Sequence, residues 1–377
     1  MLIRNAKAYL EDRFQPKTDV RLEDGVITEV GENLQPKAGE QVMDVEDKYL
    51  LPGFVDVHIH ACKGHDTMRG EEDVRCMSRD LHTFGVAAFL PTTMSGSVDE
   101  TRTAIAGVRA VMEKPEPHGA KVLGAHMEAP FLANSKCGAQ LVQYFTDPSM
   151  EKLEDMTGGD LAAVKIITIA PERDGSEAFI RQATAAGIHV SIGHTDATAE
   201  QVHHAADWGS DHVTHTFNAQ SPLHHRKPGV PGAALIDDRL YCEMICDGVH
   251  LHPDVIRLLV RAKGASKAVM ITDAMEAAGM PDGQYELGGQ KVFVKGAEAR
   301  LENGTLAGSV LTMPRALQNM ICRFGIPAED AVRMCTRTPA ESIGEDKAGR
   351  IAVGSPATLT LWDEHWQEMQ VITQDAE

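Results

Sequence analysis

The sequence is poor in positive charge. Its 377 residues include 36 Lys and Arg against 55 Asp and Glu, which gives a formal net charge of −19 at pH 7. Proteins that bind nucleic acids or anionic membrane surfaces need a basic face, so this balance excludes both as the main partner. A small anionic substrate stays compatible with the charge, because it needs only a local basic pocket.

The chain also lacks long apolar runs and any Cys-x-x-Cys pair. No stretch of about 18 apolar residues is present, so we expect no membrane span. The first residues, Met1–Lys7, contain no apolar core of a secretory signal. The seven scattered cysteines, an odd number, favour a reducing compartment over a disulfide framework. We therefore expect a cytoplasmic protein.

The middle of the chain alternates strand-like and helix-like segments. Helices are predicted between most of the apolar runs, for example over 72–83, 99–113 and 199–208. Strands are predicted over 53–60, 85–93, 121–128, 164–171, 188–195, 212–218, 241–247 and 268–274. This number of strands, with intervening helices over about 290 residues, is typical of an α/β protein built as a (β/α)8 TIM-like barrel.

Both ends of the chain are instead rich in short strands. Asp24-Gly25 separates two alternating runs, 19–22 and 26–30, which is a good hairpin signal. The runs 349–354 and 357–362 have the same character. We therefore expect a small β-sandwich domain formed by both chain ends. Its predicted parts are residues 1–50 and 349–377, and the barrel occupies 51–348.

Polar residues follow the predicted barrel strands at the end where a barrel enzyme carries its active site. His58 and His60 end the first strand and share a face, because residues two apart on a strand point the same way. An isolated pair of this kind is as readily structural as functional. Here, however, six candidate ligands fall at one end of the barrel: His58, His60, Glu128, His194, His215 and Asp273. This set suits zinc, iron or manganese, and its lack of cysteine argues against a closed structural zinc.

A divalent ion at this place would lower the pKa of a bound water to about 7 and polarise a carbonyl. A general base must then take the proton of the water and pass one to the leaving group. Asp273 is the candidate base, because it ends the last strand and a loop follows it. The alternative interpretation of Asp273 is a helix N-cap.

Two loops are candidates for substrate binding. The segment 218–229 is unusually basic for this acidic chain, and Arg226 offers the fork that grips a phosphate or carboxylate. A solvated basic loop is the alternative. The turn-rich segment 302–309 has small residues that allow a ligand to approach the backbone closely.

These motifs resemble those of the N-acetylglucosamine-6-phosphate deacetylases of the amidohydrolase superfamily. Pro-Gly-Phe-Val-Asp-Val-His-Ile-His at 52–60 marks the superfamily, whereas the loop 218–229 and Leu-Ala-Gly-Ser at 306–309 are more specific. The resemblance covers nearly the whole length, and it is also carried by 126–132, 193–198, 215–219, 247–250 and 272–274.

The resemblance implies an enzyme that hydrolyses the acetamide of N-acetylglucosamine 6-phosphate to glucosamine 6-phosphate and acetate. Hydroxide held on the metal would attack the carbonyl, and Asp273 would act as general base and then as acid. The resemblance implies one ion held by Glu128, His194 and His215, and a second held through His58 and His60. Zinc is favoured, with iron or manganese as alternatives. The substrate-binding positions that it implies are Ala139, Gln140, Asn218, Ala219, Arg226, His250, Ala307, Gly308 and Ser309, with Arg226 reaching into the partner's site of a homodimer.

One departure from the family pattern concerns the chemistry. The family's Lys-Gly-Ala-His is replaced here by Cys137-Gly138-Ala139-Gln140. Gln140 can donate a neutral hydrogen bond but cannot supply a protonated imidazole. Losing a charge-assisted donor costs on the order of a few kcal/mol of transition-state stabilisation. The rate, or the identity of the acylated sugar, is therefore open.

Three alternatives stay open. The enzyme could deacetylate another N-acyl amino-sugar phosphate, such as N-acetylgalactosamine 6-phosphate. The barrel could be catalytically silent and serve as a binding protein, although its complete ligand set argues against that. A nucleobase or cyclic-amide hydrolase would share the metals but has no evident need for the basic loop.

Overall fold

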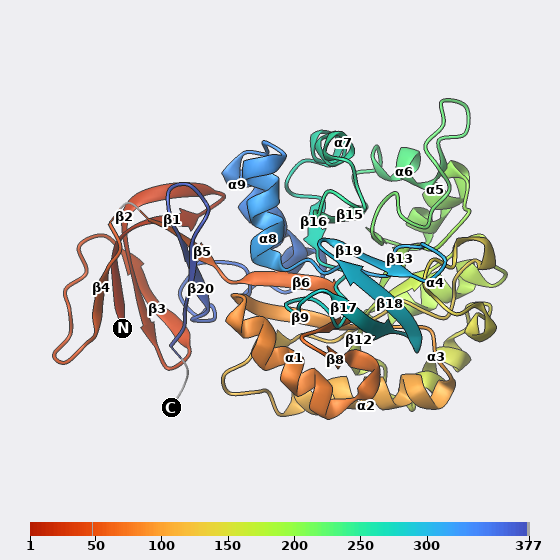
Figure 1. Cartoon of the computed structure of the whole chain (residues 1–377), viewed down its shortest axis with the longest axis horizontal. Coiled ribbons are helices and arrows are strands. Elements are labelled where there is room, and N and C mark those ends of the chain that lie inside the picture. Colours follow the sequence, from red (N-terminus) through yellow and green to blue (C-terminus); the bar gives the residue numbers. More distant parts are fainter. Residues whose placement is uncertain (47, 375–377) are drawn as a thin grey trace.

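A barrel of parallel strands forms the centre of the molecule (Figure 1). The computed structural model describes residues 1–46 and 48–374. Most residues of the barrel strands are buried, because one face packs into the barrel and the other against helices. In order around the barrel, the strands are β6 (Phe54–Ile59), β9 (Val86–Thr93), β11 (Ala125–Met127), β12 (Val164–Ile169), β13 (His189–Ile192), β14 (His212–Val213), β15 (Tyr241–Ile245) and β16 (Ala268–Ile271). Each lies within a segment that the sequence predicts as a strand, so the expected barrel is confirmed. The short strand β10 (Lys121–Val122) adds to β9.

The barrel closes at a seam between β16 and β6. The backbone N–H of Asp273, just after β16, donates to the carbonyl oxygen of His58 at 2.8 Å. The Asp56 carboxylate accepts the hydroxyl of Thr272 at 2.6 Å, and Asp56 is fully buried. These contacts bring the last barrel strand to the first, at the end where the candidate ligands lie.

Helices surround the barrel in Figure 1. Two of the predicted ones begin with a reciprocal capping box, in which Ser97 pairs with Glu100 and Thr198 with Gln201, so their first turns are satisfied. The predictions over 72–83, 99–113 and 199–208 each match a helix to within one residue. The helices are α1 (Glu71–Thr83), α2 (Val98–Glu113), α3 (Met150–Thr157), α4 (Ser176–Ala185), α5 (Ala199–Trp208), α6 (Gly229–Ala234), α7 (Pro253–Lys263), α8 (Met313–Gln318), α9 (Ala328–Cys335) and α10 (Arg337–Ser342). None of the helices in the described part of the chain is long and apolar enough to cross a bilayer.

Strands from both chain ends lie together in one sheet beside the barrel (Figure 1, left). The predicted hairpin is present, and Asp24 and Gly25 both have positive φ, as a tight hairpin turn requires. Residues 349–354 form turns and bends rather than a strand. Val26 is bridged to Pro356, so the sheet curls round its own apolar core. Its strands are β1 (Leu2–Leu10), β2 (Arg13–Glu23), β3 (Val26–Gly31), β4 (Val42–Asp44), β5 (Tyr49–Pro52), β20 (Leu359–Trp362) and β21 (Met369–Ile372).

A three-stranded antiparallel sheet follows β16 in the chain, in addition to the predicted elements. It consists of β17 (Gly283–Leu287), β18 (Gln290–Lys295) and β19 (Glu298–Leu301). The sheet has its own small apolar cluster, which includes Met94 from the barrel. Leu287 and Arg300 of this sheet face the site described below.

Candidate metal centre

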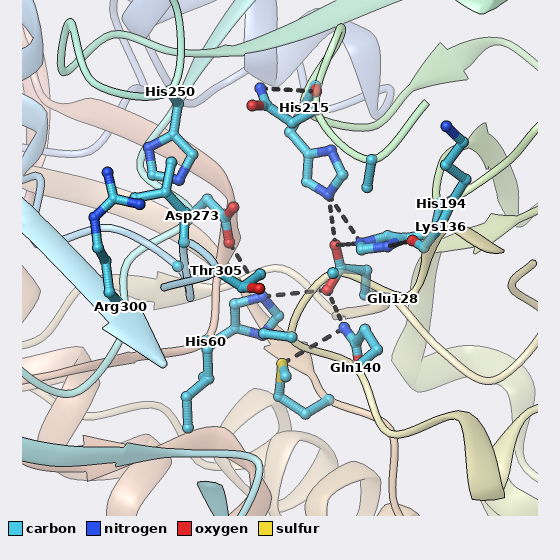
Figure 2. A pocket seen from close by; sticks show the side chains of 18 of the residues that line it. His60, Glu128, Lys136, Gln140, His194, His215, His250, Asp273, Arg300 and Thr305 are labelled. Atoms are coloured by element: carbon cyan, nitrogen blue, oxygen red, sulfur yellow. Dashed lines mark hydrogen bonds and ion pairs between the residues drawn. The ribbon is translucent and has the colours of Figure 1, made fainter. Parts of the chain in front are cut away.

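A cavity of about 490 Å³ opens at the carboxyl ends of the barrel strands. Five of the six predicted ligands line it, and Figure 2 shows them together around it: His60, Glu128, His194, His215 and Asp273. The sixth, His58, is fully buried, and its Nε2 atom lies 3.5 Å from both Glu128 Oε1 and Asp273 Oδ1. The structure therefore brings all six side chains together.

Glu128, His194 and His215 form one compact group. Glu128 Oε1 lies 3.1 Å from His194 Nε2 and 2.9 Å from His215 Nε2. The two Nε2 atoms are 3.1 Å apart. The group thus has the donors and the spacing of a three-ligand metal position.

His58, His60 and Asp273 form a second group beside the first. His60 Nε2 lies 3.2 Å from Asp273 Oδ1 and 3.3 Å from Glu128 Oε2. His58 Nε2 is buried and has no hydrogen-bond partner among the described residues. Glu128 therefore lies between the two groups, with Oε1 facing His194 and His215 and Oε2 facing His60.

Three of the six residues have a backbone conformation that side chains rarely adopt. The φ angles are 47° at His194, 29° at His215 and 49° at Asp273. Such positions cost on the order of 1 kcal/mol each and gather at functional sites, where the surrounding structure enforces them. Here they turn the side chains inward just past the strand ends.

Backbone carbonyls orient two of the imidazoles. His194 Nδ1 donates to the carbonyl of Lys136 at 2.7 Å, and His60 Nδ1 donates to that of Thr92 at 3.2 Å. Because a carbonyl only accepts, each Nδ1 carries a hydrogen, and each Nε2 is the nitrogen left to bind an ion. The donor set of imidazole nitrogens and carboxylate oxygens fits one or two divalent ions.

The carboxylates and imidazoles of the site stabilise each other's charged forms. Burial opposes protonation of His60, but the hydrogen bonds and charges of Asp273 and Glu128 outweigh it and raise its pKa to about 10. For His58, burial is likewise outweighed by the surrounding carboxylates, and the pKa rises to about 9. Burial also opposes ionisation of Glu128, yet the neighbouring imidazoles hold its pKa well below the ordinary value. At neutral pH, His58 and His60 therefore hold extra protons that an ion must displace.

We expect Zn²⁺ binding to the metal-free protein to release protons and to weaken on acidification. Because the pKa values of His58 and His60 are raised to about 9 and about 10, the competing protons are bound below these pH values and lost above them. The affinity should therefore rise with pH up to about 9 to 10, by about tenfold per pH unit for each proton displaced. Calorimetric titration in buffers of different ionisation enthalpy measures the number released. A heat of binding that does not depend on the buffer would contradict this prediction.

Gln140 lies directly against the candidate metal positions. Its amide donates to Glu128 Oε2 and contacts Met94 Sδ at 3.5 Å, while its carbonyl oxygen accepts the backbone N–H of Ser95 at 2.7 Å. The side chain is nearly fully buried. Both amide hydrogens thus have acceptors within the protein, so the side chain holds the Glu128 carboxylate in place without adding positive charge.

The residues assigned to substrate binding separate into three sets. Ala307 is buried in the apolar cluster of the added sheet, and Ser309 donates its N–H to the Asp273 carbonyl at 2.7 Å, so these two support the site from behind. Arg226 is exposed and lines a neighbouring cavity of about 740 Å³ instead. The other six line the main cavity: Ala139, Gln140, Asn218, Ala219, His250 and Gly308.

Several residues that line the cavity are not among the site residues predicted from the sequence. Lys136, Thr305, Leu287 and Arg300 are among them, and Figure 2 shows Arg300 beside His250. Leu287 and Arg300 belong to the added sheet, whose signal is the alternation over 290–295 after a Gly-Gly turn. That signal predicts a hairpin, but it does not indicate that the hairpin reaches the cavity.

Proteins that are similar to this chain in sequence belong to a family of metal-dependent hydrolases. A model of the amidohydrolase family matches residues 49–374. The N-acetylglucosamine-6-phosphate deacetylase of Lysinibacillus sphaericus is 36% identical over 366 residues, which cover 97% of this chain and 94% of that protein. The chain belongs to the amidohydrolase family, among the N-acetylglucosamine-6-phosphate deacetylases. The resemblance found from the motifs is thereby confirmed.

The chain is also similar to a deacetylase named for another amino-sugar phosphate and to solved structures of deacetylases. The N-acetylgalactosamine-6-phosphate deacetylase of Escherichia coli O157:H7 is 31% identical over 372 residues, covering 98% of this chain and 97% of that protein. Among solved structures, an Asp-to-Ala variant of the Mycobacterium smegmatis N-acetyl-D-glucosamine-6-phosphate deacetylase, in complex with N-acetyl-D-glucosamine-6-phosphate, superposes with a TM-score of 0.92. It is 28% identical and covers 100% of this chain and 98% of that one. Amidohydrolases are metal-dependent, in keeping with the two groups of candidate ligands at the cavity.

Proposed function

We propose that this amidohydrolase cleaves the acetamide of N-acetylglucosamine 6-phosphate, giving glucosamine 6-phosphate and acetate. The observation that carries the proposal is the convergence of the Glu128 group and the His60–Asp273 pair in one cavity. Relatives that match almost the whole chain are deacetylases of this substrate. The cavity volume is in the range of small-molecule sites.

We infer that Glu128, His194 and His215 hold one divalent ion and that His58, His60 and Asp273 hold a second. Zinc is favoured, and iron or manganese would also suit these ligands. When bound, the ion polarises the acetyl carbonyl and acidifies the attacking water.

Asp273 is the proton carrier in this proposal. Burial opposes its ionisation, but His58 and His60 hold its pKa down to about 2, so it is a carboxylate at neutral pH. It can therefore accept the proton of the attacking water and deliver it to the departing amine. His250 lines the cavity near Asp273 (Figure 2), and its Nδ1 pairs with Asp247 Oδ2 at 2.7 Å. That contact holds the imidazole for a substrate hydroxyl or phosphate oxygen.

Arg226 is the proposed phosphate ligand of a neighbouring subunit. In its own chain it is exposed and lines a separate cavity, so it fits a homodimer in which it reaches the partner's site. Leu223 in the same loop is 48% exposed, and Ile236 after α6 is 75% exposed. Exposed apolar side chains beside the loop support an interface here.

We expect Arg226→Ala to raise KM for the phosphorylated sugar by about 10- to 100-fold, the value of one charge-assisted hydrogen bond. Steady-state kinetics with and without the 6-phosphate measure the effect, and KM for the unphosphorylated sugar should stay unchanged. Lys227→Ala removes a neighbouring charge on the same cavity and serves as the matched control. An equal rise in KM for both sugars would show that Arg226 does not bind the phosphate. A monomeric mass in light scattering would exclude the homodimer.

Acetate release tests the proposed function. The metal-loaded protein is assayed with N-acetylglucosamine 6-phosphate, N-acetylgalactosamine 6-phosphate and both unphosphorylated sugars. The highest kcat/KM is expected on the first. A higher value on the galactosamine epimer would reassign the substrate, as the similarity to the E. coli enzyme allows. Folded, metal-loaded protein that releases no acetate from any of them would favour a binding protein.

Two further expectations belong to this proposal. We propose residues 1–50 and 349–377 as one small domain and 51–348 as the catalytic domain, supported by the sheet that both ends share. We also propose a cytoplasmic enzyme, supported by seven cysteines that are all free.

A further inference from the structure

One buried carboxylate outside the predicted ligand set contacts residues of both metal positions. Glu243 stands on β15, and its side chain is fully buried inside the barrel. Its Oε2 atom lies 3.0 Å from His58 Nδ1 and accepts the backbone N–H of His215 at 3.1 Å. The carbonyl oxygen of Glu243 also accepts the N–H of Thr216 at 2.9 Å. A single residue thus ties an imidazole of one position to the backbone of the other.

The contact with Glu243 decides which nitrogen of His58 can bind an ion. A carboxylate accepts hydrogen bonds, so His58 Nδ1 carries the hydrogen of this bond, and Nε2 is the nitrogen that can give up its proton to an ion. Nε2 is the atom that faces Glu128 and Asp273, at 3.5 Å from each. Among the described residues, Glu243 is the one whose side chain hydrogen-bonds this imidazole.

His126 is the other candidate neighbour, and it is fully occupied. Its Nδ1 donates to the carbonyl of Val57 at 3.1 Å, and its Nε2 accepts the hydroxyl of Thr168 at 2.8 Å. Its ring packs against that of His58 with centroids 4.5 Å apart. The cluster of His58, His126 and Glu243 is therefore a support for His58 rather than a third metal position.

We propose that Glu243 is a positioning residue that makes the His58–His60–Asp273 position competent to hold its ion. It fixes the tautomer and the ring of His58, and it places a negative charge behind a neutral ligand of a cation. Its second hydrogen bond holds His215 at its unusual φ of 29°. This inference rests on the metal positions of the proposed function.

Metal titration of the metal-free protein with Co²⁺ and Zn²⁺ tests the role of Glu243. The parent chain is expected to take up two equivalents. Glu243→Gln keeps an oxygen for the His215 N–H but removes the charge, so one equivalent should bind as before and the other about 10- to 100-fold more weakly. Glu243→Ala removes both hydrogen bonds and should weaken both equivalents. The visible absorption of Co²⁺ reports the missing site independently of activity.

Asp211→Asn is the matched control. Asp211 also pairs with two imidazoles, at 2.6 Å from His189 Nδ1 and 2.7 Å from His212 Nδ1, but at the amino ends of β13 and β14, and it contacts none of the ligands. With His189 and His212 it forms a separate group that could hold an ion, so the control concerns only the two equivalents bound at the cavity, which should stay unchanged. The inference is overturned if Glu243→Gln binds both equivalents like the parent, if Asp211→Asn weakens binding equally, or if the parent binds one equivalent only. Acetate release by the parent chain tests the proposed function separately from all three outcomes.

Discussion

Replacing Asp273 with Asn is expected to lower kcat by about 10³-fold, within the range that positioned acid–base groups contribute. The amide has nearly the shape of the carboxylate but cannot take the proton of the attacking water. Asp273 Oδ1 is also 3.2 Å from His60 Nε2 and 3.5 Å from His58 Nε2, so the second ion should bind more weakly as well. Acetate release and metal content are measured on the same preparation.

The design separates the two roles of Asp273. Metal is added until both equivalents are bound, and the remaining deficit in kcat then belongs to proton transfer. Asp237→Asn removes another buried carboxylate, one that pairs with Arg239 and His203 away from the cavity, and should keep kcat within severalfold. A metal-saturated Asp273→Asn protein with near-parental kcat would assign the base to another residue.

Glu128→Gln is expected to have the largest effect of all, reducing kcat/KM by at least about 10⁴-fold. Its carboxylate lies within 3.5 Å of the Nε2 atoms of four histidines, His58, His60, His194 and His215, and so faces both positions. Without its charge the imidazoles lose their common counter-ion, and neither position should retain metal through dialysis. Elemental analysis and acetate release measure the two losses.

Glu172→Gln provides the comparison for Glu128. Glu172 follows β12 at the same end of the barrel and accepts the hydroxyl of Thr195 and the N–H of Asp196, but it contacts none of the six ligands. It should keep its metal and most of its activity. A Glu128→Gln protein that retains two equivalents of metal would show that Glu128 is not the shared ligand.

The barrel and the convergence of the six candidate ligands could be predicted from the sequence because both follow from simple periodicities. Buried strands are continuous apolar runs, and the residues just past them meet at one end of a parallel barrel. His58 and His60 also share a face by their spacing. These are local patterns whose spatial consequence is imposed by the fold class.

The remaining parts of the site depend on contacts that no local pattern contains. Gln140 lies in an irregular loop, and its bond to Glu128 is set by tertiary packing. Glu243 lies inside the predicted strand 241–247, where a charged residue in an apolar run is a signal of a buried partner, yet the partner His58 is 185 positions away. Arg300 reaches the cavity through a sheet whose docking the sequence does not specify.

The seam between β6 and β16 has a consequence for how the enzyme is made. The same junction that completes the ring of strands also delivers Asp273 to His58 and His60, through the hydrogen bond from the Asp273 N–H to the His58 carbonyl. Completion of the ring of strands and assembly of the proposed second metal position are thus one event. An ion held there stabilises only the closed barrel. Its loss should therefore cause local opening first at the junction of β6 and β16, while the strands on the opposite side of the barrel stay folded.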